Sequence, residues 1–323
     1  ATASFGTWMS MPIAPGYPVA LSFQSSRADL VVHHAPFPLN DIAVATMRRH
    51  TALVVHWHAD IIGRTGFKTA LMPFIRNSLA RADRIIVSHP TMIALSEDLS
   101  SFREKCVAIP YGVDIDYWGH VSDEQQITVS KLRERFPRLI LSVGRLVPYK
   151  GYPILLRALK GMDAQLVIVG DGPLQGSLKA LAAELGVSQN VIFAGRLPRN
   201  EIKHLMHAAR VLALASITSA EAFGLVQIEA MAAGCPVVNT DLPTAVPFVA
   251  RHALEGLTVS HGDVDQLRSA LSRVLDDEKF AKALGCAARV RAHQEFSSEI
   301  FRKRNFAVYC AAFKQRQAKA EGG

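Results

Sequence analysis

Two glutamates eight positions apart, Glu221 and Glu229, are the side chains of this sequence best placed to bind a polar ligand. The apolar spacing around them predicts a helix over residues 223–233, so Glu221 lies in the loop before it and Glu229 about two turns inside it. At about 1.5 Å of rise per residue, roughly 12 Å would separate the carboxylates. Between them lie the unpaired amides at the helix N-terminus, those of Phe223, Gly224 and Leu225. Such amides bind anions, and an anion site between two carboxylates suits a nucleotide sugar.

A second motif, GRLVPYKG at residues 144–151, is predicted to link the end of a strand to the start of a helix. Arg145 and Lys150 flank its turn. Two cations beside a helix N-terminus can stabilise the charge that develops on a departing diphosphate without a metal ion. We therefore expect both side chains to contact the diphosphate of the same ligand. A solvated β-turn is the alternative interpretation.

The glycine-rich stretch GDGPLQG at residues 170–176 is interpreted as a structural turn. Its spacing is G-x-G-x-x-x-G, whereas the dinucleotide-binding fingerprint is G-x-G-x-x-G with an acidic residue after the next strand. Neither feature is present, and Pro173 falls where the helix begins. A nicotinamide-dependent oxidoreductase or a nucleotide-sugar epimerase would need that fingerprint, so both classes are disfavoured.

Three histidines stand at the ends of predicted strands in the first part of the chain. His56 and His58 end the strand at 51–58, and His34 ends the strand at 29–35. Ligands of parallel α/β sheets bind at the carboxyl ends of strands. His56 and His58 are therefore candidates for a ligand contact, and His34 is a candidate for lining an acceptor site. A zinc ion between His56 and His58 would lack a third protein ligand, so no metal is expected there.

Alternation of apolar runs with helical patterns predicts the fold class. Continuous apolar runs are typical of parallel strands buried on both faces, and their alternation with helices indicates doubly wound α/β domains. The predicted strands are 29–35, 51–58, 84–88, 106–109, 139–144, 165–170, 190–195, 211–216, 236–239 and 257–260. The predicted helices of the second half are 151–161, 174–186, 199–209, 223–233, 263–275, 278–292 and 299–314. A length of 323 residues predicts two domains, with the boundary at Phe136–Pro137, while residues 1–28 show little periodicity.

Composition and charge narrow the class of protein further. The chain is 49% hydrophobic and 20% charged, which is typical of a globular protein. Its net charge of +8 suits an acidic ligand or an anionic membrane surface. The basic residues concentrate at 48–84 and 302–319 without interleaved aromatic residues, so no nucleic-acid partner is expected. Four scattered cysteines without a Cys-x-x-Cys indicate a reducing compartment.

One basic stretch, residues 61–81, has two possible interpretations. It combines apolar residues at helical spacing with Arg64, Lys68 and Arg76. A basic amphipathic helix can lie on an anionic membrane, or it can pack on its own sheet and leave the basic face in water. The sequence leaves both interpretations open. It contains no run of about 18 apolar residues, so it predicts no helix that spans a membrane.

The string EAFGLVQIEAMAAGCPVV at residues 221–238, together with GRLVPYKG, resembles the Glu-x7-Glu signature of the retaining GT-B glycosyltransferases of group 1 (GT4). This resemblance implies an α/β fold with two Rossmann-like doubly wound domains facing a central cleft. Residues 1–136 would form an acceptor-binding domain whose first βα unit is expected to be missing. Residues 137–298 would bind the nucleotide-sugar donor, and residues 299–323 would form a C-terminal helix that crosses back to the first domain.

The resemblance also implies roles for individual residues. Glu221 would hold the hydroxyls of the transferred sugar, and Glu229 would hold the ribose. The implied catalytic residues are His58, Glu221, Arg145 and Lys150. The implied donor-binding residues are Arg145, Lys150, Arg196, Leu197, Glu221, Phe223, Gly224, Leu225 and Glu229, with Arg196 and Leu197 contacting the base through their backbone. No metal is implied, because Asp114-Ile115-Asp116, although it has the form of a metal-binding Asp-x-Asp, lies in a turn typical of this family.

The function that the resemblance implies is transfer of a sugar from a nucleotide sugar. Mannose from GDP-mannose is preferred, because the VVNTDLPTAVPFV stretch and Gln227 look like those of bacterial mannosyltransferases of surface polysaccharide assembly. The implied acceptor is a glycan or a polyprenyl-diphosphate-linked saccharide. The enzyme would be cytoplasmic, with peripheral binding to the inner face of the membrane as an option. A chain that lacks its first βα unit could instead bind the nucleotide sugar without transferring it, and this alternative stays open.

Overall fold

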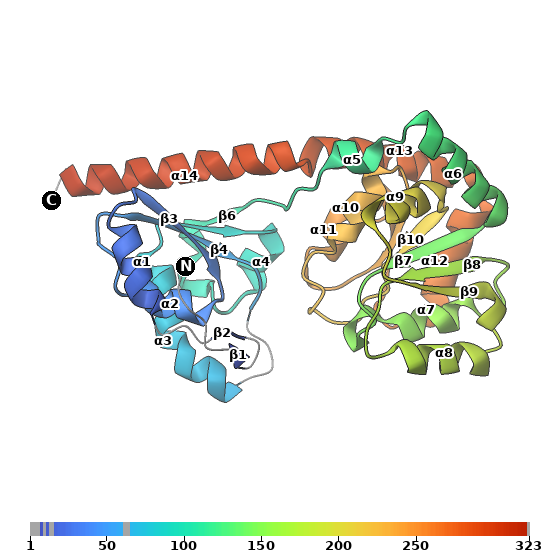
Figure 1. Cartoon of the computed structure of the whole chain (residues 1–323), viewed down its shortest axis with the longest axis horizontal. Helices are drawn as coiled ribbons and strands as arrows, with labels where there is room; N and C mark the ends of the chain where they lie inside the picture. The colour runs from blue at the N-terminus through green and yellow to red at the C-terminus, as the bar shows by residue number, and fades with distance from the viewer. Residues whose placement is uncertain (1–6, 9–10, 13–15, 61–64, 322–323) are drawn as a thin grey trace. The chain divides into compact units, whose positions relative to one another are not determined.

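The computed structural model describes residues 7–8, 11–12, 16–60 and 65–321. It divides into two compact units. Unit 1 comprises Ala1–Pro110 and Phe301–Gly323, and unit 2 comprises Tyr111–Ile300. Each unit has its own parallel sheet with helices on both faces (Figure 1).

The division between the units falls earlier than the Phe136–Pro137 boundary expected from the sequence. The intervening helices α5 (Ile115–Gly119) and α6 (Asp123–Arg135) belong to unit 2. The Arg133 guanidinium donates to the His207 carbonyl at 2.7 Å, and Val129 is fully buried in the core of unit 2. Although most of the α6 sequence is charged or polar, burial of Val129 attaches the helix to the second domain.

The sheet of unit 1 is parallel, in the order β3-β4-β5-β6, and it confirms the four strands predicted for this part of the chain. The strands are β3 (Leu30–Ala35), β4 (Ala52–Trp57), β5 (Arg84–Val87) and β6 (Cys106–Ala108). Helices α2 (Pro38–Val44) and α3 (Thr65–Arg81) pack on one face through a core that includes Trp57, Ile75 and Leu79. The other face packs against α14 (Ser298–Glu321), where Val54 and Ile86 contact Ala312.

The first 28 residues contain a helix that the sequence pattern did not predict. Helix α1 (Tyr17–Ser25) begins with a proline in its first turn and packs on α2. Proline is well tolerated there because the first-turn amide has no intrahelical partner. The weak periodicity of residues 1–28 therefore concealed a short helix with Pro18 in its first turn. Two short strands, β1 (Thr7–Trp8) and β2 (Met11–Pro12), form an antiparallel pair before it.

The sheet of unit 2 has six parallel strands in the order β12-β11-β10-β7-β8-β9. The strands are β7 (Leu139–Val143), β8 (Gln165–Val169), β9 (Val191–Gly195), β10 (Val211–Ala213), β11 (Val237–Thr240) and β12 (Gly256–Val259), and all six were predicted. The chain proceeds outward from β7 in one direction and from β10 in the other. This is the Rossmann strand order, and the adjacent pair β7 and β10 marks its topological switch point.

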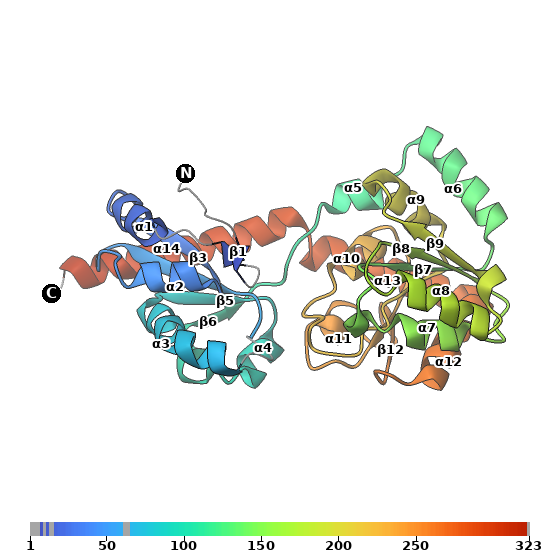
Figure 2. The ribbon, with the colours of Figure 1, turned by 60° about the horizontal axis from the view of Figure 1, so that its bottom comes forward.

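Helices cover both faces of this sheet (Figure 2). One face carries α7 (Tyr152–Leu159), α8 (Gln175–Glu184) and α12 (Val264–Asp276). The other carries α9 (Arg199–Ala208), α10 (Leu225–Ala232) and α13 (Glu278–Glu295), with α11 (Val246–Val249) beside them. The seven helices predicted for this half are confirmed, and the four-residue α11 is additional.

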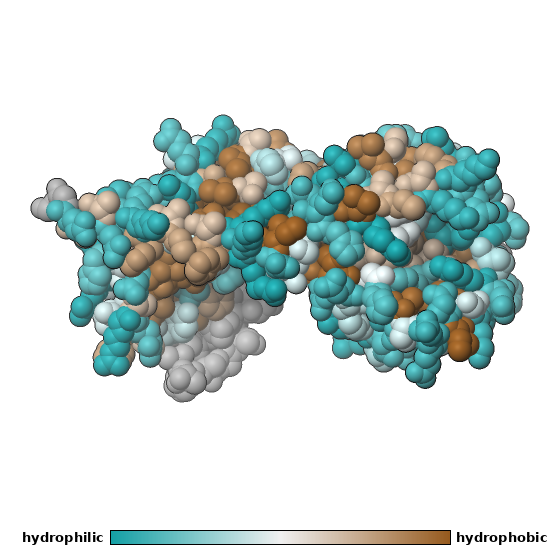
Figure 3. Space-filling model, turned by 90° about the horizontal axis from the view of Figure 1, so that it is seen from above, coloured by the Kyte–Doolittle hydropathy of each residue, from teal (hydrophilic) through white to brown (hydrophobic). Residues whose placement is uncertain are grey.

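The surface in Figure 3 is largely hydrophilic, with hydrophobic residues in separate patches. Among the described residues, no helix combines the length and apolar character that crossing a bilayer requires. For the basic stretch at 61–81, the structure forms helix α3 from Thr65, with Ile75 buried against the sheet and Arg76 exposed. Arg64 lies outside the described residues, and so does the side chain of Lys68.

Candidate functional site

The loops that follow β7 and β10 meet at the carboxyl edge of the unit 2 sheet. The Ile217 amide donates to the Tyr149 carbonyl at 2.8 Å, which joins the two loops. Gly151 has φ of 67°, and a Cβ built on it would lie 1.8 Å from the Ala215 carbonyl oxygen. Only glycine permits this close approach. The approach occurs at the switch point, where open α/β sheets bind their ligands.

This meeting of loops brings Lys150 and Glu221 into direct contact. The Lys150 Nζ lies 2.6 Å from the Glu221 Oε2, and both side chains are nearly buried, with 12% and 9% of their area exposed. The Ser216 hydroxyl donates to the same carboxylate oxygen at 2.8 Å. The sequence predicted both residues for one ligand but gave them separate partners, diphosphate and sugar. In the structure the two side chains also pair with each other, and Ser216 is a third member of this group that the sequence did not indicate.

The carboxylate of Glu221 is held on a supported loop. The Thr240 hydroxyl donates to the Ser216 carbonyl at 2.7 Å, which ties the end of β10 to the end of β11. Tyr152 donates its phenol to the Gly144 carbonyl at 3.0 Å on the other side of the Lys150 side chain. These contacts fix the backbone on both sides of the ion pair, so its geometry does not depend on solvent-exposed side chains.

Helix α10 lies within the predicted range 223–233 and has a glycine beside each end. Gly224 is the N-cap with φ of 72°, and Gly234 follows the C-cap with φ of 77°. The Cys235 amide donates to the Ala230 carbonyl and the Gly234 amide to the Met231 carbonyl, both at 2.9 Å. This is the hydrogen-bond pattern of a Schellman motif. At the other end of α10, the Gln227 amide donates to the Gly224 carbonyl at 2.9 Å, so a ligand would be bound by the amides that precede Gln227, as expected of a helix N-terminus.

A buried amide network holds the start of α10 in place. The Gln227 Nε2 donates to the Phe223 carbonyl and to the Val246 carbonyl at 3.3 Å each. The Asn239 Nδ2 donates to the Gln227 Oε1 at 2.8 Å and also to the carbonyls of Val246 and Ala250. Both side chains are almost completely buried. Gln227 therefore positions the helix that carries Glu229 and follows the loop of Glu221, and the sequence gave no signal for its partner Asn239.

Glu229 lies in a different environment from Glu221. Burial raises the pKa of its carboxyl to about 7, and the positive charge of Arg199 opposes that rise only in part. Arg199 lies over the rings of Tyr117 and Trp118, with its Cζ 4.6 Å and 5.2 Å from their centroids. A carboxyl with this pKa exchanges a proton near neutral pH. It accepts hydrogen bonds from hydroxyls at full strength only in the ionised form.

The other predicted donor residues are placed individually. Arg145 is exposed, and Arg196 forms an ion pair with Asp171 at 2.8 Å that is itself mostly exposed. Leu197 packs its side chain against the core of unit 2. Phe223 is buried, with its ring 4.9 Å from that of Tyr111. Leu197 and Phe223 could therefore contact a ligand mainly through their backbone groups.

The histidines predicted in unit 1 form a cluster at the carboxyl ends of β3 and β4. The His34 Nδ1 lies 2.8 Å from the His58 Nε2, so one ring donates to the other. The His56 Nε2 lies 2.8 Å from the hydroxyl of Tyr309 on α14. Burial and the neighbouring histidines lower the pKa of all three, that of His56 to about 4. The cluster is thus neutral at pH 7. His58 belongs to unit 1 and the Lys150–Glu221 pair to unit 2, and each group is described within its own unit.

Asp114, the first acid of the Asp-x-Asp sequence, has a structural role. Its side chain is the N-cap of α5 and accepts from the Tyr117 amide at 3.0 Å. The glycines of residues 170–176 also have a packing role, because a Cβ on Gly170 would lie 2.0 Å from the Gly144 carbonyl oxygen. Within the part of the chain that the structure describes, no three His, Cys, Asp or Glu side chains lie close enough to hold a metal ion together.

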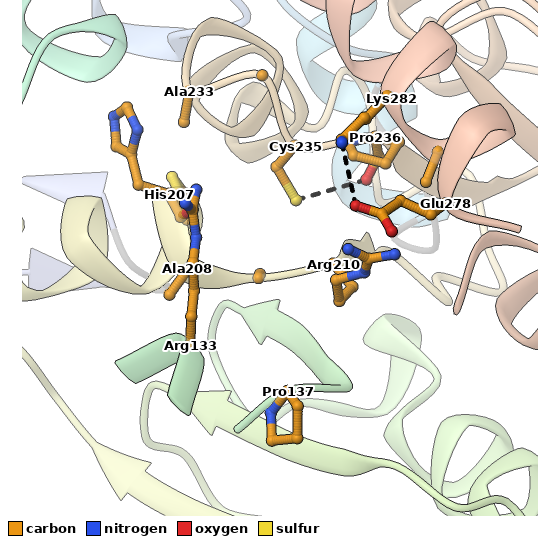
Figure 4. A pocket seen from close by; sticks show the side chains of 14 residues that line it. Arg133, Pro137, His207, Ala208, Arg210, Ala233, Cys235, Pro236, Glu278 and Lys282 are labelled. Atoms are coloured by element: carbon orange, nitrogen blue, oxygen red, sulfur yellow. Dashed lines mark hydrogen bonds and ion pairs between the residues drawn. The ribbon is translucent and has the colours of Figure 1, made fainter. Parts of the chain in front are cut away.

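A cavity of about 510 Å³ lies at the opposite edge of the unit 2 sheet (Figure 4). Residues at the starts of β7, β10 and β11 contribute to its lining, and none of the predicted donor residues does. The Lys282 Nζ is 3.1 Å from the Glu278 carboxylate, and Arg210 also points toward that carboxylate. Arg133 is engaged with the His207 carbonyl at the end of α9. The cations of this cavity are therefore matched by an acid and by a carbonyl at the end of a helix. Because the cavity shares no residue with the predicted donor site, it is separate from the candidate site.

Comparison with known proteins identifies the class. The family model described as "Glycosyl transferases group 1" matches residues 123–291, and the "Glycosyl transferase 4-like domain" matches residues 6–112. The D-rhamnosyltransferase WbpZ of Pseudomonas aeruginosa is 32% identical over 275 residues, which are 85% of this chain and 71% of that protein. The O-antigen chain mannosyltransferase C of Escherichia coli is 29% identical over 84% of this chain and 72% of its own length.

A relative that matches a shorter part of the chain carries a donor in its name. It is the GDP-mannose-dependent monoacylated alpha-(1-6)-phosphatidylinositol monomannoside mannosyltransferase of Corynebacterium glutamicum. It is 34% identical over 209 residues, and the match covers 61% of this chain and 54% of that protein. Among solved structures, a glycosyltransferase from Rickettsia africae has a TM-score of 0.78 at 19% identity, covering 97% of this chain and 84% of that one. The UDP complex of Anabaena Alr3699/HepE has a TM-score of 0.76 at 24% identity, covering 91% and 82%.

The chain belongs to the group 1 glycosyltransferases, and its fold is the GT-B fold of two Rossmann-like domains. The family resemblance drawn from the motifs of residues 144–151 and 221–238 is thereby confirmed.

Proposed function

We propose that the protein is a retaining glycosyltransferase that moves mannose from GDP-mannose to a glycan or a lipid-linked saccharide in polysaccharide or glycolipid synthesis. The observation that carries this proposal is the Lys150–Glu221 ion pair at the switch point of the unit 2 sheet. It places a cation for a diphosphate and a carboxylate for sugar hydroxyls within 2.6 Å of each other. Mannosyltransferases among the relatives support the choice of mannose, and GDP-mannose is named in one of them.

In the proposed reaction, the bond between the anomeric carbon and the diphosphate oxygen breaks as the acceptor hydroxyl attacks the same face of the sugar. The acceptor's proton passes to the departing diphosphate oxygen, so atoms and charge balance without a protein nucleophile. Lys150 and Arg145 would stabilise the negative charge that grows on the diphosphate. The first-turn amides of α10 would add to this effect. Metal independence is part of the proposal, as is peripheral binding to a membrane that carries the acceptor.

Glu221 would have two tasks in this scheme. Before the donor binds, it neutralises Lys150, which lies in a nearly buried position. When the diphosphate arrives, Lys150 can turn to it and Glu221 becomes available to the sugar hydroxyls. Glu229 would bind the ribose, and His58 would contact the donor sugar and diphosphate from unit 1. Arg196 and Leu197 would contact the base through their backbone.

The test measures donor binding, donor hydrolysis and sugar transfer as three separate quantities. Calorimetry against GDP-, UDP- and ADP-sugars is expected to give the tightest binding with GDP-mannose, and transfer to a saccharide acceptor should retain the anomeric configuration by NMR. Transfer that persists in excess EDTA supports metal independence. Binding without any hydrolysis or transfer would show that the chain only binds nucleotide sugars, and inversion in the product would contradict the proposed mechanism.

A further inference from the structure

A second cavity, of about 360 Å³, lies in unit 1 and is lined by an unusual number of cations. We call it the basic pocket. Its charged lining residues are Arg49, Arg81, Arg84, Lys105, Arg316, Lys319 and Asp83. They come from the turn before β4, from the ends of α3 and α14, and from the starts of β5 and β6. The pocket therefore lies at the amino edge of the sheet, whereas the histidine cluster lies at the carboxyl edge.

The charges of the basic pocket are not balanced within the protein. Its six basic residues face a single acid, Asp83, which leaves an excess of five positive charges in the lining. Asp83 is already engaged, because its Oδ2 accepts from the Leu53 amide at 3.0 Å and from the Arg316 Nε at 3.1 Å, and its Oδ1 forms an ion pair with the Arg316 Nη2 at 2.8 Å. Like charges held this close repel one another, so the pocket favours an anion from outside the chain.

Two of the cations show the effect of this crowding. The pKa of Lys105 is lowered by burial, and then by the charges of Lys319 and Arg316, with Asp83 opposing the change. The pKa of Arg81 is lowered by burial and by Arg316. The Arg81 Nη1 is also buried with no hydrogen-bond partner among the described residues. Donors therefore outnumber the acceptors that the protein supplies here.

The cations divide into those that support the fold and those that do not. Arg81 donates to the Thr51 carbonyl at 3.0 Å, and Lys105 donates to the Leu79 carbonyl at 3.3 Å near the end of α3. Arg316 donates to the Arg81 carbonyl at 3.3 Å in addition to its pair with Asp83. Arg49 and Lys319 are exposed, and neither side chain forms a hydrogen bond or ion pair that the structure records among its described residues.

We propose that the basic pocket binds a phosphate group. Guanidinium groups recognise phosphate through paired N–H donors, and ammonium groups add charge. The volume of the pocket accommodates such a group with part of the molecule that carries it. The phosphate can belong to a soluble molecule or to the headgroup of an anionic lipid. The site is distinct from the donor site, because every residue that lines it belongs to unit 1.

The test uses a charge-reversed pair that spares the residues supporting the fold. Arg49→Glu with Lys319→Glu changes the two exposed cations of the pocket. Arg302→Glu with Lys303→Glu is the matched control, because it makes the same change of net charge at exposed positions of unit 1 that do not line the pocket. Both pairs are placed in a background of Arg145→Ala and Lys150→Ala, which removes the proposed diphosphate contacts of unit 2. Circular dichroism confirms folding of each variant.

Two probes distinguish the sources of the phosphate. The first is inorganic pyrophosphate, titrated by calorimetry. The second is a set of phosphatidylglycerol vesicles, with phosphatidylcholine vesicles as the neutral reference, sedimented at low and high salt. We expect the pocket variant to lose affinity by at least about tenfold for one or both probes relative to the control variant. Loss for both probes identifies the phosphate group itself, loss with vesicles alone identifies a lipid headgroup, and loss with pyrophosphate alone identifies a soluble ligand.

The proposal would be overturned if the pocket and control variants bound both probes equally well. If both variants lost affinity to the same extent, the loss would reflect only the change of net charge and would overturn the proposal as well. If the charge-reversed pocket variant fails to fold, Arg49→Gln with Lys319→Gln and its control Arg302→Gln with Lys303→Gln repeat the comparison, with a smaller loss expected. Failure of this test leaves the proposed transfer reaction untouched, because the donor screen uses the unaltered residues of unit 2.

Discussion

Lys150 is the residue whose removal should most directly affect chemistry. If it stabilises the departing diphosphate, Lys150→Ala should lower kcat by roughly ten- to a hundredfold, because a charge-assisted hydrogen bond contributes about 1.5–3 kcal/mol. Steady-state kinetics with the best donor would measure this. Lys160→Ala, which removes an exposed cation at the end of α7, is the control and should leave kcat unchanged. A change confined to KM in Lys150→Ala would contradict a role specific to the transition state.

The two glutamates should respond differently to the same isosteric change. Glu221→Gln releases Lys150 from its ion pair, so the free nucleoside diphosphate should bind as tightly as before or more tightly, while transfer is lost. Glu229→Gln should weaken the nucleoside diphosphate, because the ribose belongs to that product. Calorimetry of both variants with nucleotide sugar and with nucleoside diphosphate makes the comparison. If Glu221→Gln weakens the nucleoside diphosphate as much as Glu229→Gln does, the assignment of sugar and ribose is wrong.

Glu229 also predicts a pH dependence of binding. Its pKa of about 7 means that a growing share of the carboxyl is protonated as the pH falls below neutral. If the ionised form accepts from the ribose hydroxyls, donor affinity should fall by up to about tenfold per pH unit below 7 and level off above about 8. A nucleotide sugar is the right probe, because its diphosphate does not titrate in this range. Glu229→Gln should bind with nearly constant affinity, and an unchanged slope in that variant would exclude Glu229 as the titrating group.

At the scale of elements, the loop that joins β7 to α7 depends on one glycine. Gly151 and Gly161 both have positive φ, 67° and 79°, so alanine costs about 1–2 kcal/mol of backbone energy at either position. A Cβ on Gly161 meets nothing within 4 Å, whereas one on Gly151 would lie 1.8 Å from the Ala215 carbonyl oxygen. Gly151→Ala should therefore lower the Tm clearly more than Gly161→Ala and also abolish transfer, because it separates the loops that carry Lys150 and Glu221. Equal Tm shifts and retained activity would show that the loops tolerate separation.

The elements themselves were largely predictable, because apolar runs and glycine or proline boundaries are local signals. The strands and the helices around the site followed from them, and so did the loops after predicted strands in which Lys150 and Glu221 lie. Their direct ion pair was not predictable, since it depends on how two loops more than sixty residues apart pack through Gly151. The contact between Gln227 and Asn239 is equally non-local. Helix α1 was not predicted because residues 1–28 show little helical periodicity, and a proline such as Pro18 is compatible with the first turn of a helix but not with its interior.

At the scale of the whole molecule, the two units should differ in their sensitivity to acid. In unit 1, burial lowers the pKa of His56 and His89 to about 4, and His34 and His58 are lowered as well. Between pH 6.5 and 4 the unfolded chain binds protons that the folded unit does not, so its unfolding free energy falls as the pH falls. The loss should be roughly 1–2 kcal/mol between pH 7 and 5.5, after allowance for partial exposure of the rings.

Unit 2 contains titratable groups whose effects on its unfolding free energy in acid oppose one another. His207, with a pKa lowered to about 4, destabilises the folded unit in acid, as does His204 in the same direction. Burial raises the pKa of Glu229 to about 7 in the folded unit. Between about pH 7 and 4.5, Glu229 therefore binds a proton in the folded unit but not in the unfolded chain, so acid stabilises the folded unit through this group. Hydrogen exchange at pH 7 and 5.5, corrected for intrinsic rates, should show loss of protection mainly in β4 and β5. Parallel losses in β7 and β8 would contradict the prediction, and His56→Gln should reduce the loss in unit 1.

The placement of α14 has a consequence for how the protein is made. Unit 1 is interrupted in the sequence, because Tyr111–Ile300 intervene before Phe301–Gly323 complete it. A ribosome therefore finishes all of unit 2 before it supplies the helix that covers Val54 and Ile86. During that interval the nascent first unit carries an apolar sheet face without its native cover. The later domain in the sequence can thus fold first, and the earlier one must wait for the last residues to emerge.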